Sequence, residues 1–160
     1  MELATDVLEP WFVTGLVEGE GCFTVSFTLR GKLRVGIETR PSFSISLNER
    51  DLGLIQSVHA FFRCGAIRYS RGDRTYKFES RSARDLVSNV IPHFQRFPLH
   101  GRKANDFEIF LGICRRIHAN LHMNREHLRV IIEDAYRMNP SGKRRHDRAV
   151  LLRQLDELKV

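Results

Sequence analysis

One short stretch of the sequence combines two acids with three glycines. Gly15 and Gly19 are four residues apart, Glu18 and Glu20 are two apart, and Gly21 follows directly. Glycines at i and i+4 lie on one helix face and allow a second backbone to approach, although each costs about 1 kcal/mol of helix propensity relative to alanine. The pattern therefore predicts a helix that packs closely on another backbone. Glycines that merely end the helix would explain Gly19 and Gly21 but not Gly15.

The two acids stand where this helix should end, next to the partial negative charge of its carboxyl terminus. A carboxylate beside free carbonyls is unfavourable unless a cation joins them. Carboxylate, carbonyl and water oxygens are the ligands of Mg²⁺ and Ca²⁺. Glu18 and Glu20 point about 200° apart around a helix, so only one of them can face such an ion. We expect one acid at a divalent metal ion and the other elsewhere, with a solvated helix end as the simpler alternative.

The spacing of apolar residues predicts the elements that position these groups. Period-two alternation indicates two antiparallel hairpins, over 22–47 and 67–79. Helical spacing, with Ser82 as a cap and Pro92 as a stop, predicts helices over 7–19, 50–64, 82–91, 103–117, 124–138 and 148–158. The order is αββαββα with further C-terminal helices. Residues 1–160 should therefore form one α+β domain, with helices on one face of a four-stranded antiparallel sheet.

Charge favours a polyanionic partner. The chain has 26 Lys and Arg against 19 Asp and Glu, a net charge of +7. Residues 60–103 hold ten of the basic residues and only three acids. Most of the basic residues are arginine, whose guanidinium suits phosphates and guanine edges. A concentrated basic surface predicts nucleic acid binding. The alternatives are a GC-rich genome, which enriches arginine codons, and an ordinary solvated sheet face.

Other features concern the compartment. No run of 18 apolar residues is present, so we expect no membrane association. Residues 1–6 are acidic and lack the features of a signal peptide. Cys22, Cys64 and Cys114 are too far apart for a disulfide framework or a zinc site. These features suit a reducing interior, either the bacterial cytoplasm or an organelle such as a mitochondrion or chloroplast.

A family resemblance joins these observations. Residues 13–21, VTGLVEGEG, resemble the LAGLIDADG motif of the homing endonucleases in the variant where both acids are Glu. The resemblance continues through 43–52, 62–67, 97–107 and 138–139, in the order that the family has them. It covers about residues 10–140, and the order of the segments makes the match specific.

The resemblance implies the homing-endonuclease fold and a site-specific DNA endonuclease. Such an enzyme makes double-strand breaks in a long, near-palindromic target for intron or intein homing. By this resemblance Glu20 ligates the catalytic metal with help from the Gly19 carbonyl, and Mg²⁺ is the expected cofactor, with Ca²⁺ or Mn²⁺ able to substitute for binding. The basic helper of the active site stays open among His100, Arg102 and Lys103.

One copy of the motif further implies a homodimer, with Gly15, Glu18 and Gly19 at its interface. The partner would be double-stranded DNA, read by the outward strand faces and gripped at its phosphates by basic residues near the strand ends. Base reading is expected from Thr24, Ser26, Thr28, Arg30, Glu38, Arg40, Ser42, Ser44, Arg68, Ser70, Thr75 and Lys77. Phosphate contacts are expected from Lys32, Arg34, Arg71, Arg74 and Lys143–Arg145. The sequence leaves open an intron-splicing maturase, a non-cleaving DNA-binding regulator, and an α+β domain whose basic face is incidental.

Overall fold

The computed structural model describes residues 7–139 and 142–158. Residues 1–6, from which we expect no signal peptide, lie outside this part of the chain, as do Pro140 and Ser141. No helix within the described ranges is long and apolar enough to cross a membrane.

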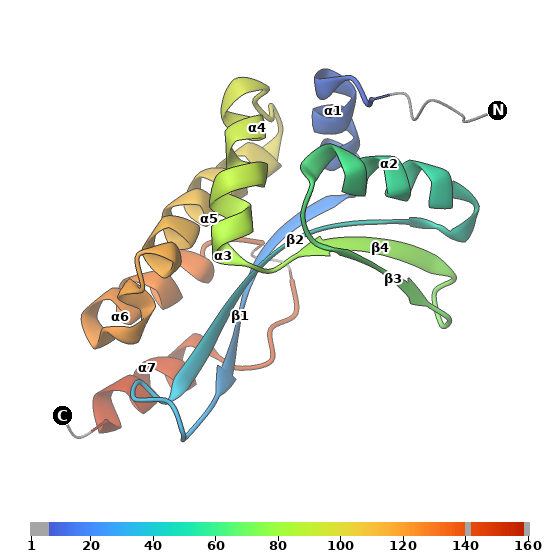
Figure 1. Ribbon diagram of the computed structural model, residues 1–160. Coiled ribbons are helices and arrows are strands. Elements are labelled where there is room, and N and C mark those ends of the chain that lie inside the picture. Colours follow the sequence, from blue (N-terminus) through green and yellow to red (C-terminus); the bar gives the residue numbers. More distant parts are fainter. Residues whose placement is uncertain (1–6, 140–141, 159–160) are drawn as a thin grey trace.

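Two helix–hairpin units follow one another, as the alternation predicts (Figure 1). The first unit consists of α1 (Pro10–Glu20), β1 (Gly21–Leu29) and β2 (Ile37–Asn48). The second consists of a 3₁₀ turn η1 (Glu49–Asp51), α2 (Leu52–Phe62), β3 (Ala66–Ser70) and β4 (Thr75–Ser80). The remaining elements are α3 (Ala83–Asp85), η2 (Leu86–Val90), α4 (Ile91–Arg96), α5 (Arg102–His118), η3 (Leu121–Met123), α6 (Arg125–Ala135) and α7 (Arg148–Glu157).

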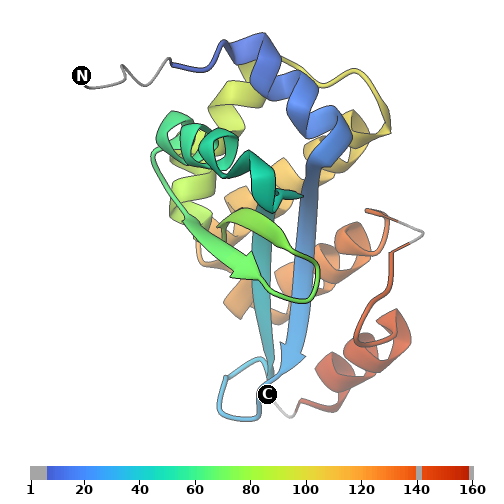
Figure 2. The same cartoon turned by 90° about the vertical axis from the view of Figure 1, so that its right-hand side faces the viewer.

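The four strands form one antiparallel sheet in the order β1-β2-β4-β3, which confirms the predicted fold class. Helices α1, α2, α4 and α5 cover one face of this curved sheet, and Figure 2 looks onto the other face, with α5 behind the strands and α1 and α2 above them. The register places Cys22, Ser44, Glu79 and Ala66 in one row across all four strands. That row begins two residues after α1 ends.

Phenylalanines fill the space between the sheet and its helices. Phe23, Phe43 and Phe78 alternate inward from β1, β2 and β4, and all three are buried. Phe43 packs edge-to-face on Phe62 of α2 and on Phe94 of α4, at centroid distances of 5.3 and 5.6 Å. These edge-to-face contacts suit the quadrupoles of aromatic rings. The alternation that buries the phenylalanines turns the polar residues of the same strands to the open face.

The predicted helix end at Pro92 is wrong, since the helix continues through this proline. Residues Leu86–Val90 form a π-helix, and the N–H of Ile91 bonds to the carbonyl of Leu86. Pro92 then lies in the first turn of α4, where its missing N–H costs little. The wider turn separates the proline from the preceding helix, and α4 runs on to Arg96.

The outer edge of β1 is covered by the connector between α6 and α7. Asn139 Nδ2 donates to the carbonyl of Phe23 at 2.7 Å, and Arg144 Nη1 donates to the carbonyl of Val25 at 2.9 Å. Arg144 also donates to the carbonyls of Ala135 and Met138 and stacks on Tyr136. Side-chain donors thus satisfy carbonyls that an edge strand leaves free. Arg144, expected to meet phosphate, is turned into the protein.

Candidate functional site

The two acids of α1 have different surroundings, as their helical spacing predicts. The carboxylate of Glu18 accepts the backbone N–H of His100 at 3.0 Å and that of Gly101 at 3.1 Å. Glu20, the last residue of α1, is exposed. Within residues 7–139 and 142–158, no hydrogen bond or ion pair holds the Glu20 carboxylate. Glu18 therefore ties α1 to the loop before α5, and Glu20 is free to bind something else.

Lys103 supplies a cation at the negative end of α1. Its Nζ donates to the carbonyl of Val17 at 2.8 Å and to that of Glu18 at 3.0 Å. These are carbonyls of the last helical turn, where a positive charge is favourable. Gly101 lets the loop approach, because a Cβ at this position would lie 2.9 Å from Oε2 of Glu18. Sequence reasoning expected a cation at this helix end but not that Lys103 would supply part of the charge.

The donors left at the end of α1 suit a hard divalent cation. They are the Glu20 carboxylate and the Gly19 carbonyl, which is not one of the two carbonyls that Lys103 binds. Oxygen donors of this kind suit Mg²⁺ or Ca²⁺ better than softer metals. The described residues contain no group of three or more His, Cys, Asp and Glu side chains placed to hold a metal. A complete ligand set therefore needs oxygens from water, a substrate or a second chain.

The three basic candidates lie at different places around α1. The ring of His100 lies beside Trp11, with centroids 6.4 Å apart, and Trp11 is in the first turn of α1, whereas Glu20 is its last residue. Arg102 is exposed at the start of α5. Lys103 alone bonds to the last turn of α1. Among the three, Lys103 is thus the candidate that the structure brings to the Glu20 end of the helix.

The pKa of the Cys22 thiol depends on burial and on charged side chains of other elements. Burial raises this pKa, Lys103 and Lys77 lower it, and Asp106 raises it. Lys77 is two residues from Glu79, which shares a row with Cys22, and Lys103 bonds to the last turn of α1.

The outward face of α1 is apolar and open. Trp11 and Phe12 are each 48% exposed, and Gly15 and Gly19 are exposed beside them. A Cβ built at Gly15 or Gly19 meets no described atom within 4 Å, so neither glycine is required by packing within the described chain. At Gly21, by contrast, a Cβ would lie 2.5 Å from the side chain of Val17. The chain's own packing therefore explains Gly21 but not the pair at i and i+4.

A buried hydrogen-bond chain anchors α1 to α4. Thr14 Oγ1 donates to the carbonyl of Phe97 at 2.9 Å and lies 3.0 Å from Nε2 of His93. Because the hydroxyl proton goes to Phe97, Nε2 of His93 must be the donor to Thr14. Burial lowers the pKa of His93 from 6.5 to about 4, so this imidazole is neutral at pH 7. The neutral ring fixes α1 against the segment that carries His100 and Gly101.

The open face of the sheet carries the strand residues expected to read bases. The alternation and the register place on it Thr24, Ser26, Thr28, Glu38, Arg40, Ser42, Ser44, Arg68, Ser70, Thr75 and Lys77. Arg30 directly follows β1, and its side chain pairs with Glu38 on this face. Lys32 and Arg34 are exposed in the turn between β1 and β2. Lys143 and Arg145 are exposed in the connector, which together with Thr24, Ser26 and Thr28 lines a cavity of about 500 Å³.

Arg74, expected to meet phosphate, has a partner within the chain. Its guanidinium pairs with Glu49, which also accepts the hydroxyl of Tyr69 at 2.6 Å. Tyr69 alternates with Arg68 and Ser70, so its side chain points to the opposite face of β3. The structure thus gives Arg74 a partner within the chain, while its side chain stays 74% exposed next to the start of β4.

Three further residues accompany the expected DNA contacts, namely Ser46 and Glu79 on the open face and Arg81 directly after β4. The Glu79 side chain is only 8% exposed and forms ion pairs with Lys77 Nζ at 3.3 Å and Arg81 Nε at 2.9 Å, while Ser42 Oγ donates to it at 2.6 Å. Burial raises the pKa of Glu79, but the Ser42 hydrogen bond and the two cations outweigh this effect and lower it. The period-two alternation that places Ser42 and Ser44 on this face places Ser46 and Glu79 there too, although neither was among the expected DNA contacts.

Comparison with known proteins gives a consistent family. A family model described as LAGLIDADG endonuclease matches residues 13–114. A "Probable intron-encoded endonuclease 2" of Neurospora crassa is 30% identical over 133 residues, which are 82% of this chain and 29% of that protein. An uncharacterized 50.9 kDa protein in ND4 intron 1 of Podospora anserina is 33% identical over 76% of this chain and 26% of its own length. The chain thus spans less than a third of the length of these relatives.

Solved structures show the same fold. The crystal structure of a homing endonuclease, I-TnaI, is 31% identical, with a TM-score of 0.81 over 95% of this chain and 99% of that one. The I-LtrWI LAGLIDADG homing endonuclease, solved bound to its target DNA, is 26% identical, with a TM-score of 0.78 over 81% of this chain but 44% of that one. The fold therefore occurs in chains of this length and as part of chains about twice as long.

Proposed function

The chain belongs to the LAGLIDADG endonuclease family, and we propose that it is a site-specific DNA endonuclease that makes double-strand breaks in a long, near-palindromic target. The observation that carries this proposal is the Glu20 carboxylate. It ends α1 without a partner among the described residues and adjoins a sheet face lined with basic and hydroxyl side chains. Homing of an intron or intein, inside a bacterial cell or an organelle, is the proposed role, and the intron-encoded relatives favour an intron.

A divalent cation, with Mg²⁺ as the expected ion, is the proposed cofactor. Glu20 and the Gly19 carbonyl would hold it, since both offer the hard oxygen donors that such ions prefer. When bound, the ion stabilises charge on the scissile phosphate and makes a water molecule more acidic. Ca²⁺ or Mn²⁺ would take the same oxygen donors and support DNA binding.

The chain's own groups have separate tasks in this proposal. Glu20 places one negative charge where the ion binds. Lys103 keeps the last turn of α1 in place, and its charge favours a phosphate nearby. Glu18 fixes the loop that carries Gly101 and leads to Lys103, so it positions the site and does not bind the ion.

Two copies of the chain would form the complete enzyme. One protomer offers one unpaired carboxylate at the end of α1, whereas cutting two strands needs two sites. The open face of α1, with Trp11, Phe12, Gly15 and Gly19, would meet its counterpart across a two-fold axis, because the glycines let the two helices approach closely. A two-fold dimer explains why the target should be near-palindromic.

Glu20→Gln tests the proposed function. The change keeps the size of the side chain but removes its charge, so Mg²⁺-dependent cleavage should fall by at least about 100-fold while DNA binding in Ca²⁺ is retained. The site must first be found, for example by selecting cleaved duplexes from a randomised pool. Glu108→Gln is the matched control, because Glu108 is an exposed glutamate of α5 and should leave cleavage unchanged.

The outcomes separate the alternatives. Full cleavage by Glu20→Gln would contradict the metal assignment. Specific DNA or RNA binding by the wild type without metal-dependent cutting would instead favour a non-cleaving regulator or a maturase on the same scaffold. Binding that barely changes with salt concentration would argue against a nucleic acid partner, because phosphate contacts give a steep dependence.

A further inference from the structure

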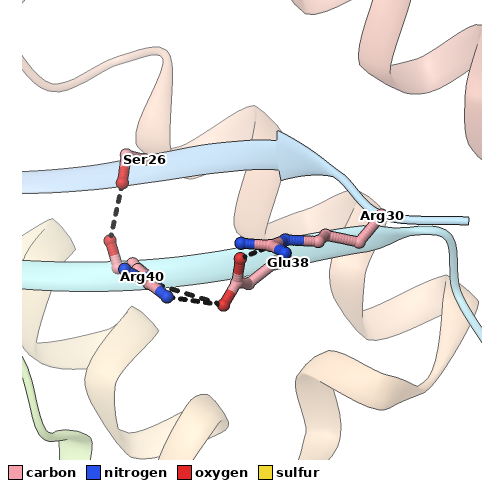
Figure 3. A network of polar contacts seen from close by, with 4 residues as sticks. All are labelled: Ser26, Arg30, Glu38 and Arg40. Atoms are coloured by element: carbon pink, nitrogen blue, oxygen red, sulfur yellow. Dashed lines mark hydrogen bonds and ion pairs between the residues drawn. The ribbon is translucent and has the colours of Figure 1, made fainter. Parts of the chain in front are cut away.

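The outer part of the open face holds a carboxylate between two arginines (Figure 3). Glu38 Oε2 accepts Nε of Arg30 at 2.9 Å. Glu38 Oε1 accepts Nε of Arg40 at 3.1 Å and Nη2 of the same arginine at 2.9 Å. The Glu38 side chain is 26% exposed, whereas those of Arg30 and Arg40 are 56% and 49% exposed. The acid therefore lies beneath its two cations.

This geometry leaves few free acceptor positions on the Glu38 carboxylate for a DNA base. Both carboxylate oxygens already accept charged donors, so the acid is a poor acceptor for the amino group of cytosine, the role expected from sequence. The hydrogen bond from Arg40 lowers the pKa of Glu38, and Arg30 adds to this effect against a smaller opposing influence of desolvation. The carboxylate is therefore ionised wherever the protein would bind DNA.

Arg30 is differently placed. Only its Nε is used by Glu38, which leaves both Nη groups without a partner among the described residues, on a side chain that is 56% exposed. Two parallel N–H groups match the O6 and N7 acceptors that guanine presents in the major groove. A guanidinium anchored at Nε also loses less rotamer freedom when it meets the base, because part of that freedom is already lost in the free protein. Arg40 uses Nε and Nη2 for Glu38 and keeps only Nη1.

We propose that Arg30 is a specificity-determining residue that reads a guanine in the outer part of each half-site, and that Glu38 is a positioning residue that holds it there. The inference rests on the proposed function. Thr28 pairs with Glu38 and Cys22 with Ser44, so the two rows are six residues apart along β1. This is a distance of roughly 20 Å. The guanine should lie about six base-pair steps farther from the cleavage site than the bases beside Cys22.

The positioning role gives Glu38 two effects of opposite sign. Its negative charge lies on the face that would meet DNA, so removing the charge should tighten binding to any duplex. The same change frees Arg30 from its anchor, so the preference for guanine should weaken. A residue that only supports the fold would change both affinities together, and a residue that reads cytosine would alter a base position of its own.

The experiment selects bound duplexes from a randomised DNA pool, in Ca²⁺, with wild type, Arg30→Ala, Glu38→Gln and the double variant. Arg30→Ala should lower the preference for guanine at one outer position of each half-site by about tenfold. Glu38→Gln should weaken the preference at that same position severalfold and tighten binding to an unrelated duplex. The double variant should be no less selective there than Arg30→Ala. Asp134→Asn is the matched control, since it breaks an acid–arginine pair with Arg137 that involves neither the hairpin nor α7.

Three outcomes would each overturn the inference. Arg30→Ala keeps the full guanine preference, Glu38→Gln changes a position that Arg30→Ala leaves intact, or Asp134→Asn reproduces the effect of Glu38→Gln. Thermal unfolding of each variant separates loss of specificity from loss of fold. If the wild-type protein enriches no sequence at all, the result contradicts both the proposed function and this inference. If the wild type enriches a site and Arg30→Ala enriches the same site unchanged, the result contradicts only this inference.

Discussion

At the scale of single residues, two chemically identical side chains have different roles because of their angle around one helix. The 200° separation of Glu18 and Glu20 predicts this difference from sequence. The partners of Glu18 do not follow from sequence, because His100 and Gly101 are more than 80 residues away and a loop brings them close. The same holds for Lys103 and for His93, whose roles depend on contacts between distant elements.

His93 predicts how stability depends on pH. Its pKa is about 4 in the folded protein and 6.5 normally, so the unfolded chain binds more protons between these values. The free energy of unfolding should therefore fall as the pH drops from 6.5 to 4, by up to about 3 kcal/mol from this group. His93→Gln should flatten the decrease in urea titrations across this range. His118→Gln, at an exposed position of α5, should keep it. Parallel curves for wild type and His93→Gln would contradict the assignment.

At the scale of elements, the period of the apolar residues was sufficient for strands and most helices. Two features could not be predicted from this period. Pro92 did not end its helix, because a π-turn separates it from the preceding residues, and nothing in the periodicity indicates such a turn. The connector after α6 was expected to present its basic residues to phosphate, yet Arg144 turns inward to cover the edge of β1. Charge alone cannot distinguish an exposed arginine from one that satisfies carbonyls.

Arg144 and its neighbour Arg145 test the edge cover. Arg144→Ala removes the donors to the carbonyls of Val25, Ala135 and Met138 and the stacking on Tyr136. It should lower the free energy of unfolding by about 2–3 kcal/mol. Arg145→Ala removes the same charge from an exposed position and should change stability by less than about 0.5 kcal/mol. Denaturant titration compares the two variants. Equal losses would show that Arg144 has no special structural role.

At the scale of the whole molecule, sequence reasoning identified the sheet, its basic face and the family, because each follows from patterns that extend along the chain. The surface for a second copy is harder to predict from sequence, because it consists of residues that the chain's own packing leaves uncovered. The structure adds that Gly15 and Gly19 have free space outside α1, next to exposed Trp11 and Phe12. This space is the physical basis for the proposed dimer.

Gly15→Leu tests that surface. No described atom lies within 4 Å of the added Cβ, and leucine favours helix by about 0.8 kcal/mol over glycine, so the isolated fold should be slightly more stable. The dimer should dissociate, because the side chain separates the two helices, and cleavage of both strands should be lost. Gly112→Leu in α5 also meets no described atom within 4 Å and serves as control. Sedimentation at several concentrations measures the mass. A Gly15→Leu protein that sediments like the wild type would rule out this interface.

The far end of the β1–β2 hairpin rests on the last helix of the chain. Gly36 has a φ of +70°, and a Cβ there would lie 3.3 Å from the amide nitrogen of Gln154 in α7. Figure 1 shows α7 beside this turn, close to the strand ends that carry Arg30 and Glu38. Changing the DNA specificity of the protein by exchanging strand residues would therefore require residues 148–157 to be treated as part of the same unit. A base-contacting side chain such as Arg30 would be displaced on an unsupported hairpin, even if the side chain itself were unchanged.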